Sequence, residues 1–239
     1  MTAMKNRALA IPYVIWMAIF VVAPLILVVV YAFTAKDGSF TLANFSGMNQ
    51  YVGVFGNSFL LAIIATVVCV ALGYPLAYLL AREGERMRKV AMMLIMLPMW
   101  MNFLLRTYSW MSLLEDTGLI NRLLSFLHLP TIHMINTPGA VVLGMVYNFL
   151  PFMVLPIFSV IEKIDPKVIE AAQDLGANSV TVFRRVILPL SLPGVLSGIT
   201  MVFIPSVSTF VITKLLGGGK TLLLGDLIEM QFLGSAYNP

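Results

Sequence analysis

Few residues in this chain combine a reactive side chain with the spacing that metal or covalent chemistry needs. His128 and His133 are its two histidines, and they lack an HExxH pattern or another spacing typical of metal ligands. Cys69 is the single cysteine and lies within an apolar run, so we expect a buried, unreactive thiol and no disulfide within the chain. The sequence therefore predicts no catalytic residue, no metal site and no enzymatic activity of its own.

One glycine-rich segment, GGGKT at residues 217–221, has part of the pattern of a phosphate-binding loop. That loop needs a glycine five residues before the glycine that precedes the lysine, and Lys214 occupies this position. No strand pattern precedes the segment. We therefore interpret it as a flexible loop and expect no nucleotide to bind this chain.

Polar and aromatic side chains within apolar runs are the remaining candidates, because polar groups that face lipid are costly. Aromatic rings can hold a cation over their faces, and carboxylates near the end of a run can attract it. Arg106 is an opposing signal, since a cation beside a path repels a cationic substrate. Anchoring at the membrane interface and hydrogen bonding between helices are alternative roles for each of these residues. The candidate path residues are Trp100, Asn102, Tyr108, Trp110, Glu115, Asp116, Tyr147 and Asn148.

The elements that position these side chains are expected to be membrane helices. Hydrophobic residues make up 59% of the chain and charged residues only 11%, with a mean hydropathy of +0.93. An ordinary soluble domain carries about 25% charged residues, so a bilayer is the expected solvent. Polar segments at 35–57, 113–137 and 214–239 are interpreted as loops, the second with a short surface helix. The predicted spans are 11–33, 58–81, 90–105, 138–161 and 190–212.

Lysines and arginines divide unevenly between the two sides of such a bundle. If the N-terminus is cytoplasmic, ten fall on the cytoplasmic side and five on the outer side. Because cytoplasmic loops are enriched in these residues, we expect a multi-pass protein with a cytoplasmic N-terminus. The first group is Lys5, Arg7, Arg82, Arg86, Arg88, Lys89, Lys163, Lys167, Arg184 and Arg185, and the second is Lys36, Arg106, Arg122, Lys214 and Lys220.

Residues 165–193 form the longest polar, helix-patterned segment, and it falls on the cytoplasmic side. Asp165 and Pro166 are typical of a helix start, and Gly176 is typical of a helix end. Asn178 or Ser179 can cap a second helix that runs toward Pro189. On pattern alone, an amphipathic hairpin lying on the lipid surface is an alternative. The apolar face of the first helix would carry Val168, Ile169, Ala172 and Leu175.

The spacing within this segment resembles the EAA loop of ABC-importer permeases. Glu170-Ala171-Ala172 is followed after three residues by Gly176, and after nine more by the sequence VILP at 186–189. Val186 departs from the isoleucine that is usual there. The resemblance implies that this loop docks on a cytoplasmic ATPase and transmits its closure to the spans. The residues implied are Glu170, Ala171, Ala172, Leu175, Gly176, Leu188 and Pro189.

Three further segments, at 72–81, 97–110 and 144–165, are similar to the permease subunits of spermidine and putrescine importers. The similarity extends over residues 55–239. It implies an all-α polytopic membrane protein with the type I, MetI-like permease fold, in which residues 1–54 supply a first transmembrane helix and outer loop. Such permeases have six spans, so with five predicted here we expect a chain that lacks the last helix.

The resemblance also implies a function and a set of partners. The chain would be a permease subunit in a bacterial plasma (inner) membrane that moves polyamines by alternating access, without a cofactor of its own. ATP and Mg would bind a dimer of a separate ABC ATPase subunit. The other partners implied are a second permease subunit, an extracytoplasmic polyamine-binding protein and the lipid bilayer, with no nucleic acid. Import of another small solute, such as a phosphonate, iron or an opine, stays open, and so does an ATP-independent secondary transporter or channel.

Overall fold

The computed structural model describes residues 11–35 and 38–233, which divide into two compact units. One unit holds the residues up to Gly53 together with those from Gln231 onward, and the other is Val54–Met230. Lys5, Arg7 and Lys36, which entered the charge count, lie outside the described residues, as do residues 234–239. Within the described ranges the secondary structure is helical, and the β pairing there is the isolated bridge between Thr34 and Phe40. The predicted all-α class is therefore confirmed.

The first unit contains the predicted N-terminal span. A helix runs over Ile11–Ala32 and includes a π-helical turn, η1 (Ala18–Val22), and α2 (Ala23–Ala32). The helix has 22 residues, and an 18-residue window within it has a mean hydropathy of 2.8. At about 1.5 Å per residue the helix is long enough to cross a bilayer. The segment 35–57 was predicted as a loop, but it contains α3 (Ala43–Ser46), the 3₁₀ turn η2 (Gly47–Tyr51) and the start of α4 (Val52–Arg82). This prediction was wrong because the first turns of α4 carry glycine and polar residues.

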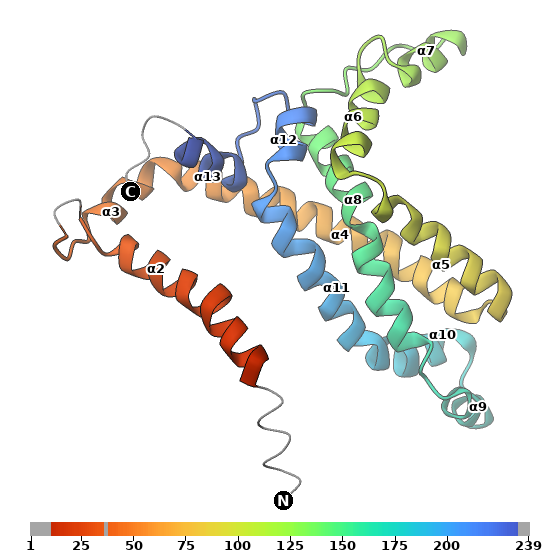
Figure 1. Ribbon diagram of the computed structural model, residues 1–239. Helices are drawn as coiled ribbons and strands as arrows, with labels where there is room; N and C mark the ends of the chain where they lie inside the picture. Colours follow the sequence, from red (N-terminus) through yellow and green to blue (C-terminus); the bar gives the residue numbers. More distant parts are fainter. Residues whose placement is uncertain (1–10, 36–37, 234–239) are drawn as a thin grey trace, which may run out of the picture. The chain divides into compact units, whose positions relative to one another are not determined.

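The second unit is built around α4, α8 (Pro138–Ile161) and α11 (Leu188–Ser208). In Figure 1, α8 and α11 lie side by side and α4 crosses them. The contact between α8 and α11 is the most extensive in the unit. Met153 of α8 lies close to the backbones of both α4 and α11. A Cβ added to Gly73 of α4 would lie 2.9 Å from Met153 Cγ, and one added to Gly198 of α11 would lie 2.6 Å from Met153 Sδ. The two glycines therefore let three helix backbones approach closely.

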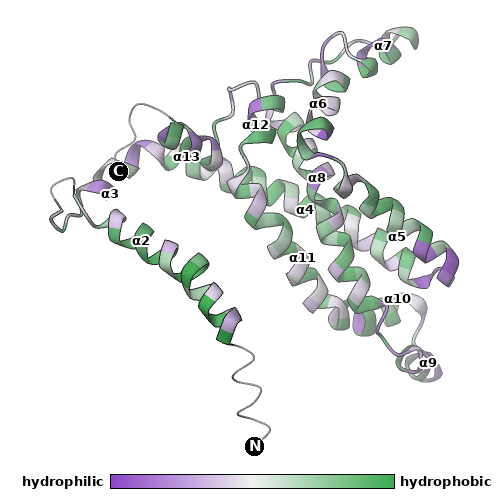
Figure 2. Ribbon diagram, viewed as in Figure 1, coloured by the Kyte–Doolittle hydropathy of each residue, from purple (hydrophilic) through white to green (hydrophobic). Residues whose placement is uncertain are grey.

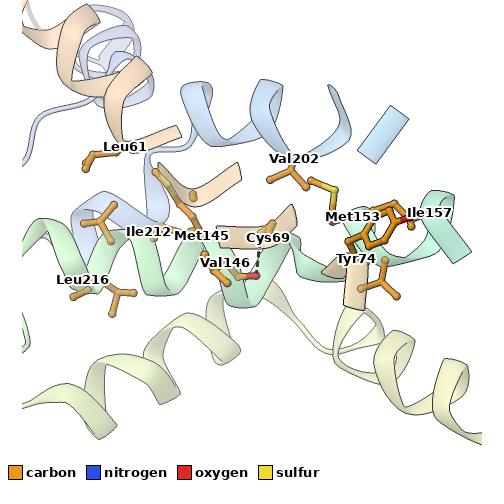
Figure 3. Close-up of a cluster of buried hydrophobic side chains, with 14 of the residues drawn as sticks. Leu61, Cys69, Tyr74, Met145, Val146, Met153, Ile157, Val202, Ile212 and Leu216 are labelled. Carbon is orange, nitrogen blue, oxygen red and sulfur yellow. Dashed lines mark hydrogen bonds between the residues drawn. The ribbon is translucent and has the colours of Figure 1, made fainter. Parts of the chain in front are cut away.

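Figure 3 shows the hydrophobic core that results from this approach. Met145, Met153 and Ile157 of α8 are fully buried, and they meet Cys69 of α4 and Val202 of α11. The Cys69 thiol is fully buried 3.9 Å from the Val146 carbonyl oxygen, which confirms the prediction of a buried thiol. The buried methionines fill irregular space between helices, as flexible thioethers do.

The outward faces of the same helices are apolar as well. Figure 2 shows hydrophobic residues along α4 and α11 and hydrophilic residues at α9 (Pro166–Asp174) and at the start of α5 (Glu85–Trp100). Val67 of α4 and Leu196 of α11 are 60% and 63% exposed. Helices that are apolar on all sides are typical of membrane spans. The four helical segments Ile11–Ala32, Gly47–Arg82, Pro138–Ile161 and Ser179–Ser208 have the length and composition to cross a membrane.

The predicted third span, 90–105, is not one straight helix. α5 ends at Trp100, and α6 (Phe103–Leu114) leaves it after a bend of 93° between Glu85–Trp100 and Phe103–Phe126. The break follows from Asn102, whose side chain accepts hydrogen bonds from the amides of Leu104 and Leu105 and so starts a new helix. Counting this broken pair as one span gives the five spans expected from the sequence. The predicted surface helix is present as α7 (Leu119–Phe126).

The end of the fifth span and the last segment also differ from prediction. The span was expected at 190–212, but its helix begins at Ser179 and ends at Ser208, and α12 (Val211–Leu216) follows as a separate helix. The segment 214–239 was expected to be a loop, and it contains α13 (Leu224–Leu233). Glycine at 217–219 obscured both helices, because it is typical of loops.

Candidate functional site

Residues 165–189 form the hairpin that the sequence predicts, and its first helix is capped at both ends. The Asp165 carboxylate accepts a hydrogen bond of 3.0 Å from the amide of Lys167, with Pro166 in the first turn of α9. Gly176 has φ +82° at the other end. There the amides of Gly176 and Ala177 donate to the carbonyl oxygens of Gln173 and Ala172, which is the Schellman ending of a helix.

The surface of α9 is open to solvent along its length. None of its residues is buried, and the apolar side chains of Val168 and Leu175 are 45% and 89% exposed. Glu170 and Ala171 are exposed too, while Ile169 and Ala172 are half-buried. A short capped helix that leaves apolar side chains uncovered outside the bundle has the properties of a docking surface.

The second arm of the hairpin is continuous with a membrane span. The Asn178 side chain accepts a hydrogen bond from the amide of Thr181 and starts α10 (Ser179–Val182), so Asn178 is the cap and Ser179 is not. α10 passes through the π-helical turn η3 (Phe183–Ile187) into α11 without a break. At the end of η3 the amide of Leu188 donates to the Phe183 carbonyl oxygen, one residue farther back than in an α-helix. This widened turn accommodates Pro189, which cannot donate to the turn before it.

The continuous helix is anchored where it enters the bundle. Val182 and Ile187 are each 2% exposed, and the Tyr74 and Ser191 hydroxyl groups are 2.8 Å apart. The helix that follows the turn at Gly176 therefore runs without a break into the contact between α11 and α8. Glu170 forms no ion pair with Arg184 or Arg185 within the described ranges, although the sequence allows one. An ion pair of 3.3 Å joins Arg88 of α5 to Glu162, the residue that follows α8.

Two of the candidate path residues, Trp110 of α6 and Tyr147 of α8, are in contact, and Asn148 follows Tyr147 on α8. The rings of Trp110 and Tyr147 contact each other edge to face, with their centroids 5.2 Å apart. Asn148 is 2% exposed, and its side-chain amide donates to the Gly144 carbonyl oxygen while its Oδ1 has no partner in the described part of the chain. Arg106 lies one turn before Trp110 on α6 and is 8% exposed. Its Nε and Nη1 are also without a described partner.

The other candidate path residues lie elsewhere. Trp100 is 78% exposed at the end of α5, Tyr108 is 49% exposed, and Asn102 caps α6. Glu115 is the C-cap residue that follows α6, and Asp116 pairs with His133 at 2.8 Å. The structure therefore joins Trp110 to Tyr147, with Asn148 next along α8, and shows no such ring contact for the other five within the described ranges.

A buried carboxyl group near α13 was not identified from the sequence. Asp226 is 4% exposed; it lies 2.7 Å from the Thr213 hydroxyl and accepts a hydrogen bond of 2.9 Å from the Leu223 amide. Its burial raises the pKa of the carboxyl above the ordinary value of 3.8, although the hydrogen bonds and Lys214 lower it in part. The sequence signal for this site is an acidic residue inside the apolar run at 222–228. Because the segment was interpreted as a loop, we did not expect this residue to be buried.

Known proteins resemble this chain in sequence and in fold. Residues 73–238 match the family model described as the binding-protein-dependent transport system inner membrane component. The spermidine/putrescine transport system permease protein PotB of Haemophilus influenzae is 39% identical over 235 residues, covering 94% of this chain and 82% of that protein. PotB of Escherichia coli K12 is 38% identical over 228 residues, covering 91% and 83%.

Among solved structures, a bacterial ABC transporter involved in the import of the acidic polysaccharide alginate superposes with a TM-score of 0.80 at 19% identity. The match covers 98% of this chain and 85% of that one. At this identity the similarity shows the fold alone. The structural match and the family match agree on an importer-type transmembrane fold.

Proposed function

This chain belongs to the family of binding-protein-dependent transport system inner membrane components, and we propose that it is the permease subunit of an ABC importer for spermidine and putrescine. The identity to two PotB proteins over more than nine-tenths of the chain is the observation that carries the substrate class. Import of a phosphonate, iron or an opine by a chain of the same family is the alternative within the class. An ATP-independent transporter would leave the hairpin without a role.

In the proposed mechanism, the hairpin at 165–189 receives energy from a separate ATPase dimer, which binds ATP and Mg. Val168 and Leu175 offer apolar area to a groove of that partner, and small Ala171 lets the two backbones approach. Because α10, η3 and α11 form one helix, closure of the ATPase would move α11 against α8. Two discrete packings of these helices would then open the bundle to one side or the other.

The proposed topology places the hairpin and the N-terminus on the cytoplasmic side. Arg82 ends α4, Arg86 lies in the first turn of α5, and Arg184 and Arg185 follow α10. The connection from α4 to α5 and helix α10 lie at the same end of the second unit as α9 in Figure 1, which supports this orientation. A second permease subunit would complete the pathway, and an extracytoplasmic polyamine-binding protein would deliver the substrate to the opposite end.

Trp110, Tyr147 and Asn148 are the residues that we propose for contact with the polyamine. An aromatic pair and an amide oxygen without a partner can hold an ammonium group by cation–π attraction and a hydrogen bond. The positive charge of Arg106, one turn from Trp110 on the same helix, would repel the bound cation. This opposition would favour release over retention, which a transporter needs.

The experiment that tests this function pairs association with uptake. Leu175→Asp should weaken ATPase association at least tenfold and lower energised uptake of radiolabelled spermidine to a similar extent. A Leu side chain contributes about 1.5–3 kcal/mol on burial, and about 1.4 kcal/mol is tenfold in affinity. The variant loses few contacts within the chain, since Leu175 is 89% exposed.

Leu123→Asp on α7 is the matched control, because Leu123 is also an exposed leucine, at 59%, and α7 lies at the opposite end of the unit from α9 (Figure 1). It should leave ATPase association unchanged. Normal association and uptake in Leu175→Asp would contradict the coupling role. Uptake of another solute in place of spermidine by the intact transporter would overturn the substrate assignment alone.

A further inference from the structure

A small apolar cleft lies between α4 and the turn that joins the hairpin to α11. Its volume is about 350 Å³, and it is open on one side. Tyr74, Pro75 and Tyr78 form the wall on α4, and Ser179, Val180 and Phe183 form the wall on α10 and η3. The cleft has no part in the polyamine contact or in the ATPase docking surface proposed above.

The shape of the cleft follows from three rings and a widened helical turn. The Phe183 ring meets Tyr78 edge to face with centroids 5.2 Å apart, and it meets Tyr74 at 5.9 Å. The Tyr74 hydroxyl is already hydrogen-bonded to Ser191. The lining therefore presents carbon rather than polar atoms, and a water-soluble anion would gain little inside it.

The mouth of the cleft carries a positive charge. The Arg82 guanidinium lies 4.9 Å from the centroid of the Tyr78 ring and is exposed. Arg88 contacts Glu162 and Lys89 contacts Glu85, whereas Arg86, Arg184 and Arg185 form no ion pair within the described ranges. Within the described ranges no ion pair includes Arg82, so its donors are available to a ligand.

The position of the cleft along the span identifies the ligand. Arg82 is the last residue of α4, and the charged residues of the connection to α5 follow it directly, so Arg82 lies at the level where the hydrocarbon core gives way to headgroups. Tyr78 and Pro75 lie one and two turns deeper, within that core. An apolar cleft below a guanidinium at this level complements an acyl chain below a phosphate.

We infer that this cleft binds an anionic phospholipid, with one acyl chain between Tyr78 and Phe183 and the phosphate on Arg82. The guanidinium can hold two phosphate oxygens at once, while the ring below it keeps it in place. A bound lipid would brace the turn at η3 against α4. The binding itself does not depend on the identity of the transported solute.

Native mass spectrometry of the full chain in detergent tests this inference, with phosphatidylglycerol and phosphatidylcholine added in parallel. One phosphatidylglycerol should be retained in preference to phosphatidylcholine, and Arg82→Gln should lower that retention about tenfold, since hydrogen bonds to charged groups are worth about 1.5–3 kcal/mol. Val180→Trp should have the same effect by filling the cleft from an exposed position, because Val180 is 62% exposed.

Two control variants separate this site from general attraction to lipid. Arg86→Gln removes another exposed arginine near the end of α4, and Leu79→Trp adds a ring at a position of α4 that is 59% exposed and outside the cleft. Both should retain phosphatidylglycerol as the parent chain does. An equal loss in Arg86→Gln would overturn the inference in favour of a diffuse basic surface.

Three other results would also contradict a lipid site. The first is equal retention of phosphatidylcholine. The second is displacement of the lipid by inorganic phosphate, which would indicate an anion site without an acyl chain. The third is protection of the cleft from hydrogen exchange by the ATPase subunit and not by phosphatidylglycerol, which would assign it to a protein partner.

Discussion

The hydroxyl groups of Tyr74 and Ser191 lie 2.8 Å apart and join α4 to α11 across 117 residues of sequence. Ser191 also donates to the Leu188 carbonyl oxygen at 3.0 Å, so its oxygen is left to accept the proton of Tyr74. We expect a coupling energy of about 0.5–1.5 kcal/mol between the two side chains. Thermal unfolding in detergent of Tyr74→Phe, Ser191→Ala and the double variant measures it. If the two single losses simply add, the hydroxyl groups do not interact.

The approach of α11 to α8 should make Gly194 intolerant of a single methyl group. A Cβ at Gly194 would lie 2.8 Å from the Pro156 carbonyl oxygen and 3.0 Å from the Ile157 Cα, and neither backbone atom can turn aside. Although alanine favours a helix over glycine by about 0.5–1 kcal/mol, overpacking here should cost about 1–3 kcal/mol. Gly194→Ala is therefore expected to lower the melting temperature in detergent.

Gly56→Ala is the control for this prediction, because a Cβ at Gly56 of α4 meets no atom within 4 Å. It should keep or raise the melting temperature. A Gly194→Ala variant that melts like Gly56→Ala would show that the two helices do not pack this closely.

The positions of the helices could be predicted closely from the lengths of the apolar runs. The breaks between the helices could not. The end of the span predicted at 11–33 and both ends of the span predicted at 138–161 agree with the structure almost to the residue, since a long apolar segment is stable in a bilayer as a helix. Pro189 was taken as the end of a helix, but the π-helical turn before it lets the helix continue. A proline indicates a missing hydrogen bond, and only the packing around it decides whether the helix stops.

Some parts of the candidate site could be predicted from the sequence and others could not. The hairpin was predictable because its caps, Asp165 and Gly176, act within a few residues of sequence. The contacts of the candidate path residues were not predictable. Whether Trp100 or Trp110 contacts Tyr147 depends on the 93° bend after α5. Asp226 was missed for a related reason: its partner Thr213 is 13 residues away and on another helix.

We expect Gly176 to be required at the end of α9 only because glycine adopts the backbone conformation found there. Its φ of +82° is strained for a residue with a side chain, yet a Cβ there meets no atom within 4 Å. Gly176→Ala should therefore loosen the end of α9 by about 1–2 kcal/mol, and Gly176→Asn by less, because asparagine tolerates this region better. Hydrogen exchange of the α9 amides should be about 5–30 times faster in the alanine variant.

Gly84 provides the comparison for Gly176, since its φ is an ordinary −61° and a Cβ there also meets no atom within 4 Å. Gly84→Ala should leave hydrogen exchange in α9 unchanged. Equal exchange in Gly176→Ala and the parent chain would mean that the Schellman ending does not hold the hairpin.

Burial of Asp226 raises the pKa of its carboxyl group, whereas the hydrogen bonds to Thr213 and Leu223 lower it in part. Its Oδ1 and the Phe210 carbonyl oxygen both lie 2.7 Å from the Thr213 hydroxyl, which has one proton to donate. A protonated Asp226 satisfies all of these atoms, because it donates to Thr213, which donates to Phe210. The pKa of the carboxyl is raised mainly by burial, as this arrangement requires, and the charges of Lys214 and Glu229 act on it in opposite directions.

The sign of the pH dependence follows from the raised pKa. Between the ordinary value of 3.8 and the higher value in the folded chain, the folded state binds more protons than the unfolded state. The contribution of Asp226 to stability is therefore fully present below 3.8 and is lost as the pH rises through the folded-state pKa.

Asp226→Asn should imitate the protonated form, since its amide donates to Thr213 while its oxygen accepts from Leu223. Melting temperatures in detergent across pH should thus fall with rising pH more steeply for the parent chain than for Asp226→Asn. A parent chain that instead gains stability relative to the variant as the pH rises would show that Asp226 is ionised in the fold.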